Sequence, residues 1–157
     1  AAAIAEFLGL KPNEIKKGIE SYKTVGSRSN VIRKNTITII DDCYNANPSS
    51  MEVAIENIAS KKSERNLLIL GDMLELGEWS HDEHCRILQL AAQVKNAELL
   101  LVGAEFLKAA HTLGIDATCC ANSTEATEWV AESKISDTTI LLKGSRGIKL
   151  EKIIAVL

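Results

Sequence analysis

Short runs of apolar and β-branched residues alternate with longer amphipathic stretches along most of the chain. Each apolar run ends in a polar or glycine-containing loop. Nearly continuous apolar character over a short run is typical of strands that are buried on both faces. A weaker strand at 30–34 is expected to pair with the first long strand across Lys34 and Asn35. The long strands are predicted at residues 36–42, 66–71, 97–102, 117–120 and 138–143.

The amphipathic stretches between these runs predict helices. Pro48 suits the first position of a helix, with Asn47 as its N-cap. Ser80 and Glu83 have the spacing of a capping box at the start of the next helix. The helices are expected at residues 48–60, 80–95, 104–112, 123–133 and 147–156.

This alternation of strands and helices predicts an α/β fold. Its sheet is expected to be mostly parallel, with helices on both faces and hence three layers. Residues 1–25 differ from the rest, because they read as two short helices followed by the glycine- and serine-containing segment "TVGSRSN". Such composition is typical of a linker, so we place a domain boundary near residue 26.

Composition and charge narrow the class of protein. The chain has 157 residues, of which 46% are apolar and 25% charged, as in an ordinary soluble globular domain. A net charge of −3 gives no reason to expect nucleic acid or an anionic membrane as a partner. No apolar run approaches the roughly 20 residues of a membrane span, and no basic region marks a signal peptide. The four cysteines form no CxxC pair, which favours reduced thiols in a cytosolic protein.

Three polar loops follow strands of the predicted sheet. They are Asp41–Pro48, "GDMLELGE" at 71–78 and "KGSRG" at 143–147. In an open α/β sheet, ligands bind at the carboxyl ends of the strands. Any one of these loops alone reads as a polar turn that caps a helix, but their coincidence at one edge predicts a binding site.

The first of these loops has the chemistry of a nucleotide site. Asp42 can accept hydrogen bonds from ribose hydroxyls, while Asp41 suits a structural cap or an acid that supports the ligand-binding residues from behind. Tyr44 offers a flat face and a hydroxyl, or packs at the rim. Asn45 and Asn47 can both donate and accept hydrogen bonds, although Asn47 suits capping equally well.

The last loop has the chemistry of an anion site. Lys143, Ser145 and Arg146 are expected at the N-terminus of the last helix, where free N–H groups and the helix dipole favour anions. Arg146 can bind a carboxylate or phosphate through two parallel hydrogen bonds.

Two other kinds of site are not expected. His81, His84 and Cys85 share one helical face, but no fourth residue has the spacing of a metal ligand, so we predict no metal site. The phosphate-binding motifs GxxxxGK[ST] and GxGxxG are absent from the sequence.

Three motifs together resemble a known family. "DDCYNANPSSMEVAI" (41–55), "LLILGDMLELGE" (67–78) with His84 downstream, and "LLKGSRG" (141–147) are similar to the C-terminal domain of the Mur ligases. The resemblance is strongest to the branch that adds D-alanyl-D-alanine to UDP-N-acetylmuramoyl-tripeptide. Cys43 stands where the family often has serine, a residue of similar size.

The resemblance implies a Rossmann-like C-terminal domain at 26–157, preceded by the end of a central ATPase domain and its linker at 1–25. It implies a bacterial, cytoplasmic, ATP-dependent enzyme that forms an amide bond during peptidoglycan precursor synthesis. In this family the central domain holds the phosphate loop, the magnesium ligands and a modified lysine. ATP and Mg²⁺ are therefore expected to bind mainly outside this chain, which alone should hold no catalytic residue and be inactive.

The resemblance also assigns nucleotide-binding roles. Arg28 corresponds to an arginine that reaches the phosphates of ATP, and Asp42 to the acid that binds ribose. The residues that correspond to the segment around the nucleotide and the incoming dipeptide are Tyr44, Asn45 and Asn47.

A second group of residues is implied to face the peptide substrates. Lys143, Ser145 and Arg146 correspond to the loop that follows the family's last strand. The second motif contributes further candidates without individual roles, namely Asp72, Glu75 and His84.

Two alternatives stay open at this point. A receiver-type phosphoacceptor domain would explain the early acid pair and Lys143, but its third strand must end in aspartate and "LLLVGAE" supplies none. A non-catalytic α/β binding module would lack a phosphate loop encoded upstream, whereas a Mur ligase requires one.

Overall fold

A computed structural model of the chain describes residues 1–21, 29–61 and 63–157. Its centre is a six-stranded sheet with the order β1-β2-β6-β3-β4-β5. Every neighbouring pair is parallel except β1 and β2, which form an antiparallel hairpin. The strands are β1 (Asn30–Lys34), β2 (Ile37–Asp42), β3 (Asn66–Gly71), β4 (Ala97–Val102), β5 (Thr118–Cys120) and β6 (Thr139–Lys143).

The sheet confirms the predicted strands and the mostly parallel α/β class. The central strand β3 is buried at every position, which is why its sequence shows no polar alternation. The hairpin turn lies one residue later than expected, at Asn35 and Thr36, because Lys34 pairs with Ile37. Asn35 has a positive φ of 51°, a conformation that asparagine tolerates better than most residues.

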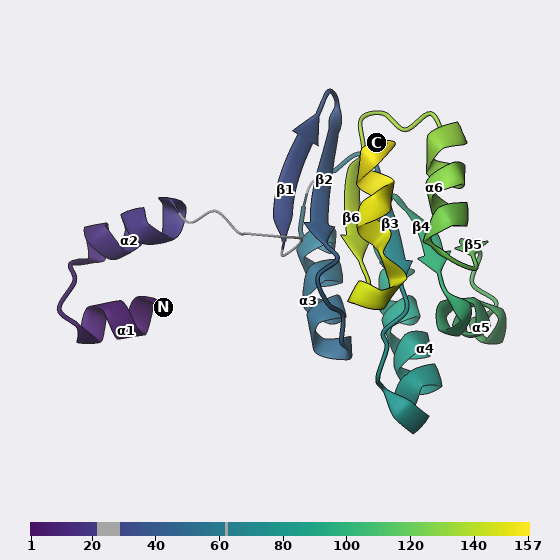
Figure 1. Cartoon of the computed structure of the whole chain (residues 1–157), viewed down its shortest axis with the longest axis horizontal. Helices are drawn as coiled ribbons and strands as arrows, with labels where there is room; N and C mark the ends of the chain where they lie inside the picture. Colours follow the sequence, from purple (N-terminus) through teal and green to yellow (C-terminus); the bar gives the residue numbers. More distant parts are fainter. Residues whose placement is uncertain (22–28, 62) are drawn as a thin grey trace.

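Helices cover both faces of the sheet (Figure 1). One apolar cluster joins α3, α4 and α5 to the sheet, and a second joins α6 and η3 to the opposite face. The three predicted layers are therefore present. The helices are α1 (Ala2–Phe7), α2 (Pro12–Ser21), α3 (Pro48–Ala59), α4 (Ser80–Ala91), α5 (Ala104–Leu113) and α6 (Ser123–Glu132), with 3₁₀ helices η1 (Gly77–Trp79), η2 (Arg146–Ile148) and η3 (Leu150–Ala155).

Two expectations about helix ends were wrong. The last helix is not an α-helix over 147–156, because Lys149 adopts a left-handed conformation (φ 61°) between η2 and η3. The capping box of Ser80 and Glu83 does not form: α4 begins at Ser80 as predicted, but no side chain caps its first turn. Glu83 instead pairs with Arg86 at 2.9 Å.

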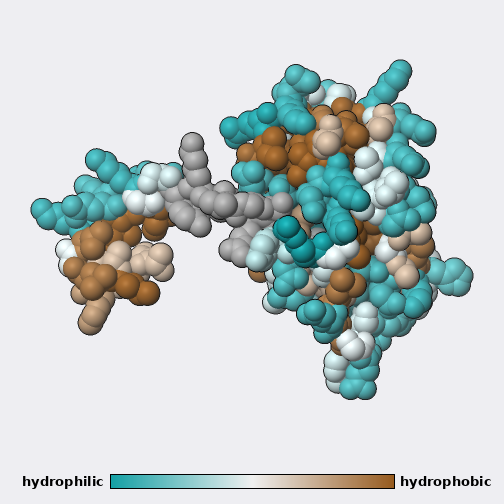
Figure 2. Space-filling model, viewed as in Figure 1, coloured by the Kyte–Doolittle hydropathy of each residue, from teal (hydrophilic) through white to brown (hydrophobic). Residues whose placement is uncertain are grey.

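Helices α1 and α2 differ from the rest of the structure. They contain no buried residue, and Figure 1 draws them apart from the sheet. Figure 2 shows apolar side chains gathered on one side of this helix pair. Among the described residues, Phe7 is 90% exposed and Leu8 69%. The predicted boundary near residue 26 and Arg28 both lie outside the described residues.

No helix of the described residues is both long and apolar enough to cross a bilayer.

Candidate functional site

The sheet order brings the three polar loops to one edge. Strand β6 lies between β2 and β3, and in register Lys143 is opposite both Asp42 and Leu70. The segments that follow these strands therefore leave the same edge on adjacent strands (Figure 1). This confirms the prediction that the three loops lie at one edge of the sheet. The sequence supported that prediction only through the expected parallel direction of the strands.

Lys143 and Asp42 form a buried ion pair at this edge. The Lys143 ammonium lies 2.6 Å from Asp42 Oδ2, and the exposed fractions of the two side chains are 2% and 19%. Lys143 Nζ also donates to the main-chain oxygen of Asn45, at 3.2 Å. The lysine thus links the end of β6 to the first loop, so the ammonium of a residue expected to face substrate is engaged inside the protein.

The other oxygen of Asp42 holds Ser29, a residue that the sequence did not single out. Asp42 Oδ1 accepts hydrogen bonds from Ser29 N–H (2.9 Å) and Ser29 Oγ–H (3.1 Å). A carboxylate has about four acceptor positions, so capacity for one more donor, such as a ribose hydroxyl, remains. No motif signals Ser29, because its role depends on a contact thirteen positions along the chain.

Tyr44 and Arg146 meet at the exposed rim of the site. The guanidinium carbon of Arg146 lies 5.7 Å from the centre of the Tyr44 ring, within the range of a cation–π contact. Both side chains are exposed. A ring contact of this kind uses the face of the guanidinium, whereas its N–H donors lie along the edge.

The two asparagines of the first loop make local hydrogen bonds. Asn47 Oδ1 accepts from Ser50 N–H at 2.9 Å, and Asn47 N–H donates to Ser50 Oγ, so the pair forms a capping box on α3. The predicted N-cap is therefore confirmed. Asn45 Oδ1 accepts from Ala46 N–H at 2.9 Å. In each amide this leaves the NH₂ group as the donor suited to a ligand.

Replacing Asn47 by aspartate separates its two possible roles. Aspartate keeps the acceptor that caps α3, so the melting temperature should change little, whereas alanine should cost about 1 kcal/mol. If the NH₂ group of Asn47 binds nucleotide, then the ATP-dependent enzyme that the resemblance implies should show a raised KM for ATP when it carries Asn47→Asp. Asn122→Asp is the control for the KM alone: Asn122 also caps a helix through its side-chain oxygen, but its NH₂ donates to Glu125 at 3.0 Å, so its melting temperature is not compared. An unchanged KM for ATP would leave Asn47 with capping alone.

Asp72 and His84 of the second motif face inward. Asp72 accepts the N–H groups of Glu105 (3.0 Å) and Phe106 (2.9 Å) at the start of α5. The fully buried His84 accepts Met73 N–H at Nε2 (3.0 Å) and donates from Nδ1 to the oxygen of Ser80 (2.6 Å). These contacts fix the loop after β3 to α4 and α5.

The outer part of the same loop is exposed. Glu75 has a positive φ of 68° and an exposed side chain. Leu74 is 46% exposed, and a Cβ added at Gly147 would lie 2.8 Å from its Cδ1. The sequence did not single out Leu74, although an apolar residue within a polar motif was its signal. Leu74 thus lies beside the last loop, and the exposed Glu75 follows it in the chain.

Cys43, in the first motif, is not a reactive thiolate. Burial raises the pKa of the Cys43 thiol far above its usual range, and the nearby Asp41 carboxylate raises it further. Cys43 N–H donates to Asp41 Oδ1 at 3.4 Å, so this carboxylate contacts the backbone of its own turn. The thiol therefore stays protonated and serves packing.

The described residues do not gather a metal site. His81 and Cys85 approach each other at 3.7 Å, but His84 turns inward to Met73 and Ser80. No group of three His, Cys, Asp or Glu side chains within the described ranges could hold a metal ion.

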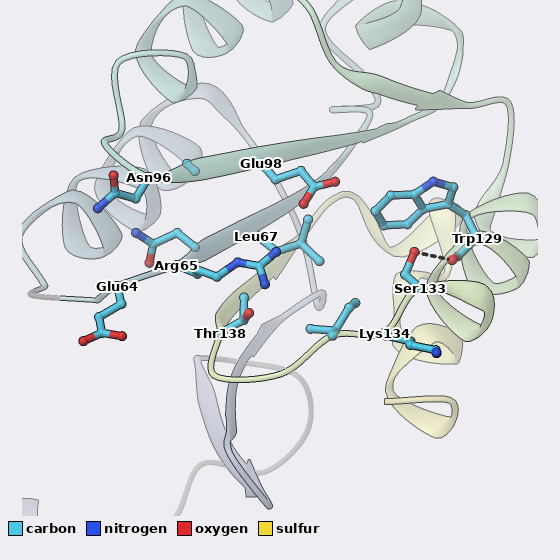
Figure 3. Close-up of a pocket in the computed structure, with 12 residues that line it drawn as sticks. Glu64, Arg65, Leu67, Asn96, Glu98, Trp129, Ser133, Lys134 and Thr138 are labelled. Atoms are coloured by element: carbon cyan, nitrogen blue, oxygen red, sulfur yellow. Dashed lines mark hydrogen bonds between the residues drawn. The ribbon is translucent and has the colours of Figure 1, made fainter.

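A hollow of about 620 Å³ lies at the opposite edge of the sheet, where β3, β4 and β6 begin. Figure 3 shows Arg65 and Glu98 extending into it, with the Trp129 ring along one side. None of the sequence-predicted site residues lines this hollow. Its residues therefore serve as controls for the carboxyl edge.

The chain is similar to known proteins in family, sequence and structure. Residues 27–146 match the family described as "Mur ligase, glutamate ligase domain". The chain is 31% identical, over 156 residues, to the UDP-N-acetylmuramoyl-tripeptide–D-alanyl-D-alanine ligase of Treponema pallidum (strain Nichols). That alignment covers 96% of this chain and 34% of the relative.

Solved structures give a concordant picture. MurF from Acinetobacter baumannii superposes with a TM-score of 0.83 at 28% identity, covering 96% of this chain and 34% of that one. MurF ligase from Thermotoga maritima, solved in complex with ADP, shares the fold with a TM-score of 0.76 at 22% identity, covering 98% of this chain and 35% of that one. This chain thus spans about a third of the length of the relatives it matches.

Proposed function

This chain belongs to the Mur ligase family, and from that premise we propose that it is the C-terminal domain of an ATP-dependent ligase. The parent enzyme joins D-alanyl-D-alanine to UDP-N-acetylmuramoyl-tripeptide during peptidoglycan precursor synthesis in the bacterial cytoplasm. The observation that carries the proposal is the convergence of the three motif loops at one edge of the sheet. The relatives that match almost the whole chain are UDP-N-acetylmuramoyl-tripeptide–D-alanyl-D-alanine ligases.

The proposed reaction has two steps. The tripeptide carboxylate attacks the γ-phosphorus of ATP, which gives an acyl phosphate and releases ADP. The amine of D-alanyl-D-alanine then attacks the acyl carbon, forms the amide bond, loses a proton and expels inorganic phosphate. Water competes with the amine for the acyl phosphate, so a site that closes around the substrates favours the amide product.

Residues of this chain supply binding and orientation in that scheme. Asp42 has acceptor capacity left for a ribose hydroxyl, and Asn45 and Asn47 each have an amide donor nearby. Arg146, exposed beside Tyr44, is suited to a carboxylate of the peptide substrates. The described residues do not fit a magnesium site, so no step is assigned to a metal bound here.

Helices α1 and α2 are proposed to belong to the preceding domain of the parent chain. They bury no residue of their own, yet they expose a set of large apolar side chains (Figure 2). Burying such side chains contributes about 1.5 to 3 kcal/mol each. A partner surface would supply that burial, which supports a domain boundary in the segment between α2 and β1. The exposed apolar residues of the two helices and of the segment that joins them are Ile4, Phe7, Leu8, Leu10 and Ile19.

The isolated chain should not turn over ATP. It contains no phosphate loop and no gathered metal ligands among its described residues, so it presents part of a site. Phosphate release is the measurement, with ATP, tripeptide and D-alanyl-D-alanine present and the parent enzyme as positive control. Phosphate release by the isolated chain that requires both peptide substrates would contradict the proposed division of the site.

A further inference from the structure

Ser145, in the loop after β6, contacts both of the other loops at the carboxyl edge. Its N–H donates to the main-chain oxygen of Asp72 at 3.1 Å. Its Oγ accepts Leu74 N–H at 2.9 Å, and the hydroxyl donates to the oxygen of Ala46 through a longer contact of 3.5 Å. Ser145 lies in the loop after β6, whereas its partners lie in the loops after β2 and β3. One small side chain therefore connects all three.

The hydroxyl of Ser145 is engaged inside the protein. The residue is only 5% exposed, and both the donor and the acceptor function of its hydroxyl already have main-chain partners. Arg146, the next residue, is exposed. In the last loop, Ser145 therefore contacts the protein interior, whereas Arg146 is exposed to solvent.

Close backbone packing makes this connection rigid. A Cβ added at Gly144 would lie 2.9 Å from the Cα of Gly71, closer than real Cβ contacts allow. At position 144, just before Ser145, only glycine therefore allows the chain to approach Gly71 so closely. Packed so closely, the two loops have little room to shift separately.

We infer that Ser145 is a positioning residue that holds the nucleotide loop and the peptide-facing loops in one fixed arrangement. The inference rests on the proposed function and revises the expected role of Ser145 as a direct substrate contact. The nucleotide loop contains Asn45 and Asn47 on either side of Ala46, and the peptide-facing loop contains Arg146. Loss of the Ser145 hydroxyl should therefore disturb both substrates together.

Steady-state kinetics of the parent enzyme distinguish the two roles. We expect Ser145→Ala to lower kcat/KM by roughly 10- to 100-fold for ATP and for the peptide substrates alike, because small misplacements of reacting groups are costly. Ser145→Thr keeps the hydroxyl and should recover most of the activity. Ser123→Ala is the matched control, since Ser123 is also buried but stands at the start of α6. A loss confined to one substrate, or no loss, would overturn the inference.

An inactive wild-type parent enzyme would instead contradict the proposed function, so the two failures are distinguishable. Amide hydrogen exchange of the wild-type chain tests the connection without any variant. Leu74 has an exposed side chain, yet its N–H donates to buried Ser145 Oγ, so this amide should exchange at least tenfold more slowly than an unprotected one. Exchange of Leu74 N–H at the unprotected rate would overturn the inference even if Ser145→Ala failed to fold.

Discussion

Replacing Lys143 by methionine should lower the free energy of unfolding by about 2 to 3 kcal/mol. The substitution leaves the Asp42 carboxylate without its cation at a site where water has little access. Breaking a fully buried ion pair typically costs about 3 to 5 kcal/mol. A smaller loss is expected here because 19% of the Asp42 side chain is exposed and Ser29 still donates to its other oxygen.

Urea unfolding of the chain measures this loss, and a double variant tests its cause. If the uncompensated carboxylate is responsible, Asp42→Asn combined with Lys143→Met should be more stable than Lys143→Met alone. Lys134→Met is the control, because Lys134 is exposed and has no ion pair among the described residues. A Lys143→Met variant within about 0.5 kcal/mol of the wild type would show that the pair contributes little, as exposed pairs usually do.

Replacing Arg146 by lysine should reduce kcat/KM of the parent enzyme for one peptide substrate by about 10- to 150-fold. Lysine keeps the charge but loses the planar pair of N–H donors that matches a carboxylate. Losing one hydrogen bond to a charged group costs about 1.5 to 3 kcal/mol, which corresponds to that range. The KM for ATP and the melting temperature should stay unchanged, because Arg146 is exposed and its described contact is with Tyr44.

The matched control for that variant is Arg65→Lys, an exposed arginine at the opposite edge of the sheet (Figure 3). It should leave every kinetic constant unchanged. An Arg146→Lys enzyme with normal kinetics would remove Arg146 from the site, and a raised KM for ATP alone would move it to the nucleotide.

The sequence predicted the sheet because its strands carry a strong local signal. Strand β3 reads "NLLILG" and is buried throughout, so the apolar run and the observed strand coincide. The end of the chain carried an ambiguous signal. Leu150 and Ile153 are buried and three residues apart, a spacing that suits an α-helical face and one full turn of a 3₁₀ helix equally. The left-handed Lys149 decides between them, and no local pattern predicts it.

The sequence predicted which loops form the site, but not where their side chains point. Because the strands were expected to be parallel, Asp42 and Lys143 were predicted at the same edge of the sheet. Their ion pair, however, depends on the insertion of β6 between β2 and β3. That insertion joins positions 101 residues apart. Asp72 and His84 were identified as members of a motif, yet their inward contacts with α5 and Met73 follow from tertiary packing. Motif spacing carries no information about either contact.

The most direct test of the proposed function is product analysis with the parent enzyme. The enzyme is incubated with ATP, UDP-N-acetylmuramoyl-tripeptide and D-alanyl-D-alanine, and its products are identified by mass spectrometry. We predict one UDP-N-acetylmuramoyl-pentapeptide per phosphate released, and loss of both products when residues 29–157 are deleted. Absence of the pentapeptide with the intact enzyme, or its undiminished formation after the deletion, would contradict the proposed role of this domain.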